Sequence, residues 1–147
     1  MIPEILLRYV HFICIFIIVG SIVGQHLLLK KEMPPSAIKR LFFLDNLYGA
    51  ATIFLLAAGF TLWFGVGKPA AFYSTNWIFH LKIGLFGLMG ILSLVPSLFF
   101  RKYRKGTEAT LVVVPARVFW VIRIELLLLL LIPMMASLMA RGIGSIP

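Results

Sequence analysis

The stretch RYVHFICIFIIVGSIVGQHLLL, residues 8–29, decides the fold of this 147-residue chain. A helix needs about 20 predominantly apolar residues to cross the ~30 Å hydrocarbon core of a bilayer, and this stretch supplies them. His11 near its start and His26 near its end interrupt the apolar run. Histidine is costly to place inside a membrane, so each is a candidate functional residue. The stretch therefore predicts a spanning helix with a candidate site toward each end.

The rest of the chain repeats this pattern. Hydrophobic residues make up 61% of the chain and the mean hydropathy is +1.04, whereas soluble domains are about 45–50% apolar. The long apolar runs predict helices at about residues 5–29, 41–65, 77–100 and 115–141, with Pro96 loosening the third. Because the loops are short, we predict one all-α transmembrane domain over residues 1–147, an integral membrane four-helix antiparallel bundle with up-down-up-down connectivity.

Basic residues in two loops account for most of the net charge of +9. The first and third loops hold them: Lys30, Lys31, Lys39, Arg40, Arg101, Lys102, Arg104 and Lys105. Lys and Arg gather on the cytoplasmic side of membrane proteins. The pattern predicts that both termini lie on the outer (periplasmic) side of a bacterial inner membrane. The charge thus indicates a lipid bilayer as the partner, and we expect no nucleic acid.

This orientation divides the polar residues of the spans into two sets by depth. The outer set comprises His11, His80 and Lys82. The inner set comprises His26, Asp45, Arg123 and Glu125. The chain has no phosphate-binding loop, nucleophile triad or zinc cluster, so these two sets hold the candidate chemistry.

The outer set is a candidate haem site. Neutral imidazole ligates haem iron, and bundle cores build such sites from facing helices. His11 and His80 are therefore candidate axial ligands of haem b, and Lys82 would pair with a propionate or supply a proton. The alternative is that both histidines only form interfacial hydrogen bonds and that Lys82 reaches the lipid headgroups. We expect no metal site beyond these haem ligands.

The inner set indicates ion pairing first. Charges inside a span normally pair, and Asp45 is the natural partner of Arg123. Glu125 lies two residues from Arg123 and points in another direction on its helix. Glu125 with His26 is an alternative, proton-handling pair. The inner set is therefore expected to be a structural polar network, with proton or metal transport as a weaker functional interpretation.

Longer motifs resemble a known family. Segments such as RLFFLDNLYGAA, WIFHLKIGLFGLMGILSLVPSLFFR and RIELLLLLLIPMMASLMARGIG resemble small bacterial four-helix membrane proteins of the uncharacterised DUF2214 type. The resemblance covers nearly the whole chain. It implies the fold and the membrane topology, and it implies no activity.

A more distant similarity bears on chemistry. The first-helix histidines and the WIFHLK segment, with Trp77, His80 and Lys82, are similar to HemJ-type protoporphyrinogen oxidases, and the helix arrangement is also similar to CopD-like membrane domains. The HemJ resemblance implies functional roles for His11 and Lys82. We therefore expect a haem-binding or redox-linked membrane protein. The alternative is a non-catalytic accessory subunit that packs against a larger respiratory, photosynthetic or transport complex, or a homo-oligomer.

Overall fold

Four long helical segments dominate the computed structural model, which describes residues 1–147. The elements are α1 (Ile2–Leu28), β1 (Glu32–Met33), α2 (Pro35–Phe64), α3 (Ala70–Ser74), α4 (Trp77–Leu92), α5 (Leu94–Tyr103), β2 (Val112–Val113) and α6 (Ala116–Ala140). α1, α2, α4 together with α5, and α6 are each long and apolar enough to cross a membrane. The prediction of four helices that are long and apolar enough to span a membrane is confirmed.

The second helix starts earlier than its apolar run. We predicted a start near residue 41, with both loop prolines outside the helix, but α2 begins at Pro35. Proline suits the first helical position because its ring fixes a helical φ and the missing N–H has no partner there in any case. The rest of the proline-containing loop is therefore short, and it brings α1 and α2 close together.

The third span is broken into α4 and α5 at Ser93. Pro96 lies in the first turn of α5, where its missing N–H removes one helical hydrogen bond. The Ser93 hydroxyl donates a 2.6 Å hydrogen bond back to the Gly90 carbonyl in the last turn of α4. The expected effect of Pro96 thus takes the form of a break between two shorter helices.

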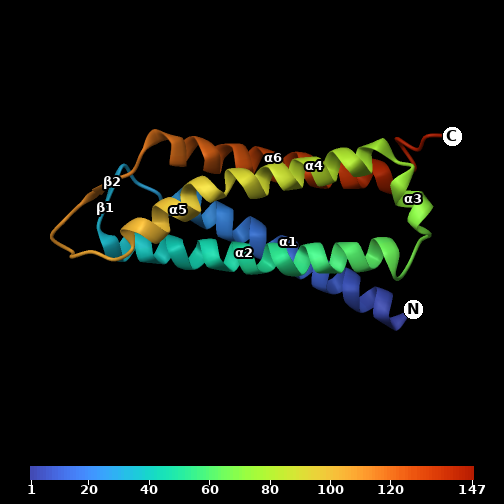
Figure 1. Ribbon diagram of the computed structural model, residues 1–147, viewed down its shortest axis with the longest axis horizontal. Helices are drawn as coiled ribbons and strands as arrows, with labels where there is room; N and C mark the ends of the chain where they lie inside the picture. Colours follow the sequence, from blue (N-terminus) through green and yellow to red (C-terminus); the bar gives the residue numbers. More distant parts are fainter.

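The bundle consists of two helix pairs. α1 packs along α2, and α4 packs along α6. Figure 1 shows the N-terminus, the C-terminus and α3 at one end of the molecule, and the loops that carry β1 and β2 at the other. The two strands pair antiparallel, with Glu32 opposite Val113 and Met33 opposite Val112. This small sheet was not expected in an all-α chain. It links the loop between α1 and α2 to the loop between α5 and α6.

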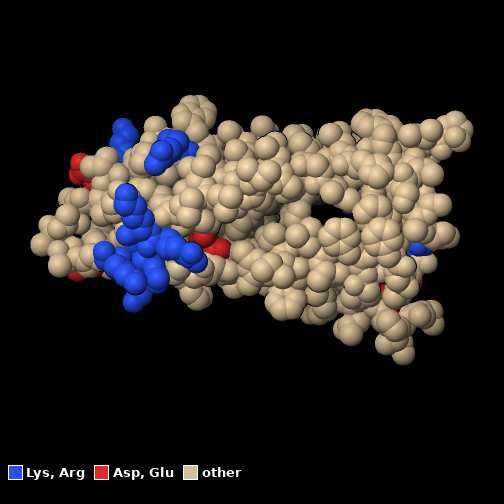
Figure 2. Space-filling model, viewed as in Figure 1, with Lys and Arg blue, Asp and Glu red and all other residues tan.

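The two ends of the bundle differ in packing and in charge. The main core of 17 buried residues includes Ile22, Leu41, Phe100 and Ile122 and lies largely toward the β1–β2 end, whereas a separate core of three residues stands at the other. Most of the Lys and Arg side chains in view gather at the β1–β2 end, as Figure 2 shows. We call this the basic end and the opposite one the terminal end.

Asn76 organises the terminal end. Its Oδ1 accepts hydrogen bonds from the backbone N–H groups of Ile78 and Phe79 at 3.0 and 3.4 Å, so it caps the start of α4. Its Nδ2 donates to the carbonyl of Ile143 at 3.1 Å. Asn76 is fully buried. The start of α4 is thereby tied to the segment that follows α6.

Candidate functional site

A cavity of about 280 Å³ lies in the half of the bundle toward the terminal end, between α1, α2 and α4. Aromatic and aliphatic side chains form most of its wall, including Phe60, Phe79 and Phe86. His11 and Lys82 are the only ionisable residues that line it. Figure 2 shows an opening through the side of the molecule in this half, where lipid would surround a spanning bundle.

His11 reaches the cavity from α1 because α2 leaves room for its ring. The ring carbon Cε1 lies 3.9 Å from the point where a Cβ on Gly59 would stand. The ring also lies close to the backbone of Leu55. Its Nδ1 is buried and no protein group completes a hydrogen bond to it. A buried polar atom without a partner is uncommon in native structures, which makes His11 the candidate ligand residue of this cavity.

Lys82 reaches the same cavity from α4. Its side chain is partly buried, and its Nζ lies 5.2 Å from the centre of the Phe79 ring. No carboxylate pairs with it, since the single ion pair in the structure joins Arg8 to Glu4 at 2.8 Å. The cavity therefore offers an unpaired ammonium group within an apolar wall.

His80 does not join this site. It is exposed, its Nε2 lies 2.8 Å from the backbone carbonyl of Ser74, and it does not line the cavity. Residues two apart on a helix point in different directions, and the His80 ring lies beside Trp63, 6.5 Å between ring centres, rather than in the cavity. The expected grouping of all three is corrected: the structure joins His11 to Lys82 and leaves His80 outside.

The ion pair expected in the inner set is not formed. Asp45 is buried, and its Oδ2 accepts a 2.6 Å hydrogen bond from the Ser97 hydroxyl. Arg123 is exposed, with its guanidinium 5.3 Å from the centre of the Trp120 ring. The long arginine side chain thus extends outward from α6, and the prediction that it neutralises Asp45 is wrong.

The pairing of Glu125 with His26 is not formed either. Glu125 is 1% exposed and its Oε1 has no hydrogen-bond partner, whereas His26 is exposed and forms no hydrogen bond. Gln25, the residue before His26, is buried instead of His26. Sequence reasoning missed Gln25 and Ser97, although Gln25 continues the buried face of α1 at a helical spacing from Ile18.

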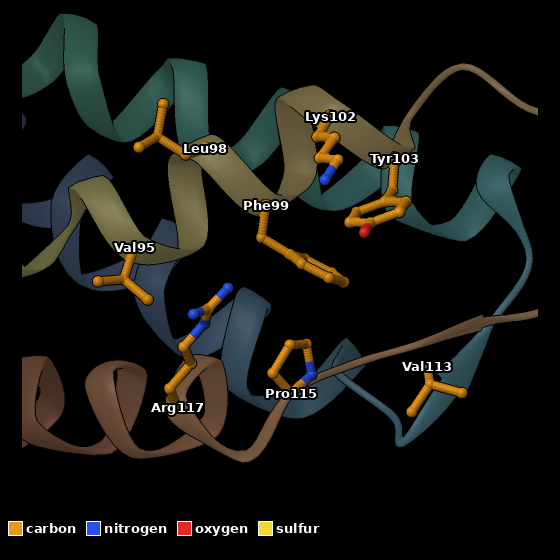
Figure 3. A pocket seen from close by; sticks show the side chains of 8 residues that line it. All are labelled: Val95, Leu98, Phe99, Lys102, Tyr103, Val113, Pro115 and Arg117. Carbon is orange, nitrogen blue, oxygen red and sulfur yellow. The ribbon is translucent and has the colours of Figure 1, made fainter.

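A second cavity, of about 340 Å³, opens at the basic end between α5, β2 and the start of α6. Figure 3 shows Lys102 and Arg117 approaching it from α5 and α6, with the Phe99 ring between them. None of the candidate ligand residues lines this cavity. It is therefore separate from the His11–Lys82 site.

A family model described as "Predicted membrane protein (DUF2214)" matches residues 3–144. No curated protein and no solved structure matches the chain. The similarity to HemJ-type oxidases and CopD-like domains therefore depends on the quoted motifs alone.

Proposed function

The chain belongs to the family of predicted membrane proteins that this match defines, and we propose that it binds a flat, lipid-soluble cofactor between α1, α2 and α4, with haem b as the first candidate. One observation carries the proposal. A histidine with an unsatisfied ring nitrogen and an unpaired lysine share one apolar cavity. A redox-linked role follows from such a cofactor.

The residues present fit a haem held by one protein ligand. Ligand pockets are usually ~300–1,000 Å³. The cavity of about 280 Å³ is just below this range, and it lies where the side of the bundle is open. His11 would ligate the iron, as a single proximal histidine does in several haem proteins. Lys82 would pair with a propionate. The haem would supply electron-transfer chemistry, while the chain positions it and excludes water.

We also propose an orientation in the bacterial inner membrane. The basic end would face the cytoplasm, because Lys and Arg of short loops remain on that side, and Figure 2 supports a strong asymmetry of charge between the ends. The two termini and α3 would then face the periplasm. In this orientation the His11–Lys82 cavity lies in the outer leaflet.

An accessory role in a larger respiratory, photosynthetic or transport complex is the second candidate. Gly84 is exposed on α4, and a Cβ placed there would meet nothing within 4 Å. Small residues on a spanning helix permit close approach of another helix. This role predicts that the protein co-purifies with a larger membrane complex in mild detergent, and a stable solitary protein would contradict it.

The absorption spectrum of protein purified from haem-replete cells tests the first candidate. We expect a Soret band in the wild type, its loss or shift in His11→Ala, and a lower haem occupancy in Lys82→Ala. His80→Ala is the matched control, because His80 lies outside the cavity, and its spectrum should equal that of the wild type. A colourless wild-type protein would refute haem binding, and a spectrum altered only in His80→Ala would refute the ligand assignment.

A further inference from the structure

Buried polar side chains gather where all the spanning segments meet, away from the His11–Lys82 cavity. Asp45 and Glu125 supply the two carboxyl groups of this cluster, from α2 and α6. Each lies roughly 15 Å along its helix from the basic end, at about 1.5 Å per residue. Both helices carry basic residues in the turns before these positions, Arg40 in α2 and Arg117 in α6. The two carboxyl groups therefore lie in the half of the bundle toward the basic end.

The surrounding side chains come from the other segments. Gln25 of α1 lies next to Asp45, and Ser97 of α5 donates to it. Tyr48 of α2 lies near both Asp45 and Glu125. The cluster adjoins the break between α4 and α5, and broken spanning helices commonly contribute to binding sites within membrane proteins.

Several of these buried groups have no partner. Glu125 Oε1, Gln25 Nε2 and the Tyr48 hydroxyl are buried and complete no hydrogen bond. Glu125 and Gln25 are each 1% exposed. Native proteins rarely leave buried polar atoms unsatisfied, because each costs about 1–3 kcal/mol. The unsatisfied atoms thus point to a ligand or water within the cluster.

The charges that face the pair do not neutralise it. Neither carboxyl group forms an ion pair, since the structure contains only the Arg8–Glu4 pair. Arg101, exposed in the last turn of α5, is the one cation that acts on Asp45, and it does so from beyond ion-pair distance. Tyr48 is the only other titratable group at the pair, since His26 and Arg123 are exposed. Two carboxylates within each other's field in a membrane cannot both stay ionised at low cost.

We propose that the buried carboxyl groups of Asp45 and Glu125 form a proton-binding site and that the two groups together hold one exchangeable proton. A metal cation suits the cluster less well. The Ser97 hydroxyl already donates its hydrogen to Asp45, and no group of three or more His, Cys, Asp or Glu is present to hold a metal ion. The proton is taken from a hydronium ion and returned to water as hydronium, so the pair carries a net charge of −1 with the proton bound and passes through −2 only while the proton exchanges. The site does not depend on the haem proposal.

The test uses dicyclohexylcarbodiimide on the full chain in proteoliposomes, with peptide mass spectrometry to locate the adducts. The reagent takes up the proton of a carboxylic acid while the carboxylate oxygen adds to its central carbon, and the product rearranges to a stable N-acylurea. We expect adducts at Asp45 or Glu125, at no more than one per chain, and less labelling as the pH rises. The exposed residues Glu32 and Glu108 are internal controls and should remain unlabelled.

Each outcome decides the proposal. Equal labelling of Glu32 and Glu108, or no labelling of Asp45 and Glu125, would overturn it. Protection of the pair by Na⁺ at constant pH would also overturn it, because a metal cation would then occupy the site. The double variant Asp45→Asn with Glu125→Gln should lose the adduct. The positions of the adducts in the wild-type protein test the proposal even if the double variant does not fold.

Discussion

The Ser97 hydroxyl donates a 2.6 Å hydrogen bond to the Asp45 carboxyl group, and this bond joins α2 to the first turns of α5 just after the break at Ser93. Fifty-two positions separate the two residues in the chain. The bond thus crosses between the two helix pairs of the bundle. It also lies next to the main core, where the pairs are most closely packed.

Ser97→Ala should lower the free energy of unfolding by about 1–2 kcal/mol, because it leaves a buried acceptor unsatisfied. Thermal unfolding in detergent measures the change. Ser36→Ala is a matched control, since the Ser36 hydroxyl donates a 3.0 Å hydrogen bond to the Glu108 carboxylate on the surface. That variant should lose less than about 1 kcal/mol. Equal losses in both would show that burial adds nothing to the Ser97 bond.

Arg123→Gln should change the unfolding midpoint little. Arg123 is exposed and contacts only the neighbouring Trp120 ring at 5.3 Å, an interaction of about 0.5–1 kcal/mol at an exposed site. The same thermal assay measures it. A large loss in Arg123→Gln that disappears when Asp45 is also replaced by Asn would restore the Asp45–Arg123 pair that the structure rejects.

Gly144→Ala should destabilise the terminal end. Gly144 has a φ of +88°, and a Cβ there would stand 2.7 Å from Ile78 Cγ1 and 2.8 Å from Asn76 Oδ1. The backbone strain costs ~1–2 kcal/mol, and the clash adds ~1–3 kcal/mol. Gly142→Ala isolates the first cost, because Gly142 has a φ of +79° but open space around it. Unfolding midpoints that fall equally in the two variants would contradict the clash.

Gly59 can be used to close the His11–Lys82 cavity. Gly59→Ala should be tolerated, because the added Cβ would meet His11 Cε1 at 3.9 Å, an ordinary van der Waals contact. Gly59→Leu should fill the space beside the ring and abolish the Soret band while the unfolding midpoint changes by less than that of Gly144→Ala. A normal Soret band in Gly59→Leu would place the cofactor elsewhere.

The proposed membrane orientation can be tested with single cysteines. Cys14 is the only natural cysteine and is buried, so Cys14→Ala provides a background. In that background, Ser145→Cys at the terminal end should react with a membrane-impermeant thiol reagent added to intact cells. Thr107→Cys in the basic-end loop should react only after the membrane is opened. The reverse result would invert the orientation.

Hydropathy was enough to predict the four spans, because a long apolar run is compatible with few structures other than a membrane-spanning helix. The ends of the helices were less accurate, as α2 shows, since a proline can start a helix as well as precede one. The pairing β1–β2 could not be foreseen, because two-residue strands carry no alternating pattern.

The site was predicted only in part, because sequence gives the depth of a residue more readily than its direction. His11, His80 and Lys82 were all placed at similar depth, but the face of α4 toward α2 carries Phe79, Lys82 and Phe86 at helical spacing. His80 lies off that face. Arg123 and His26 were likewise expected to pair with carboxyl groups within the bundle, but both are exposed. A long polar side chain, or one near the end of a span, reaches water or headgroups at a lower free-energy cost than burial would have.

The pairing of Glu32–Met33 with Val112–Val113 fastens the two helix pairs to each other at one end of the bundle. The strands join the turns of the two helix pairs at the basic end, while residues 65–76, which include α3, connect α2 to α4 at the other. Both ends of the bundle are thus fastened, and the opening that Figure 2 shows lies between them in the side of the molecule. A molecule dissolved in the lipid would reach the cavity sideways from the bilayer, without passing through water on either side.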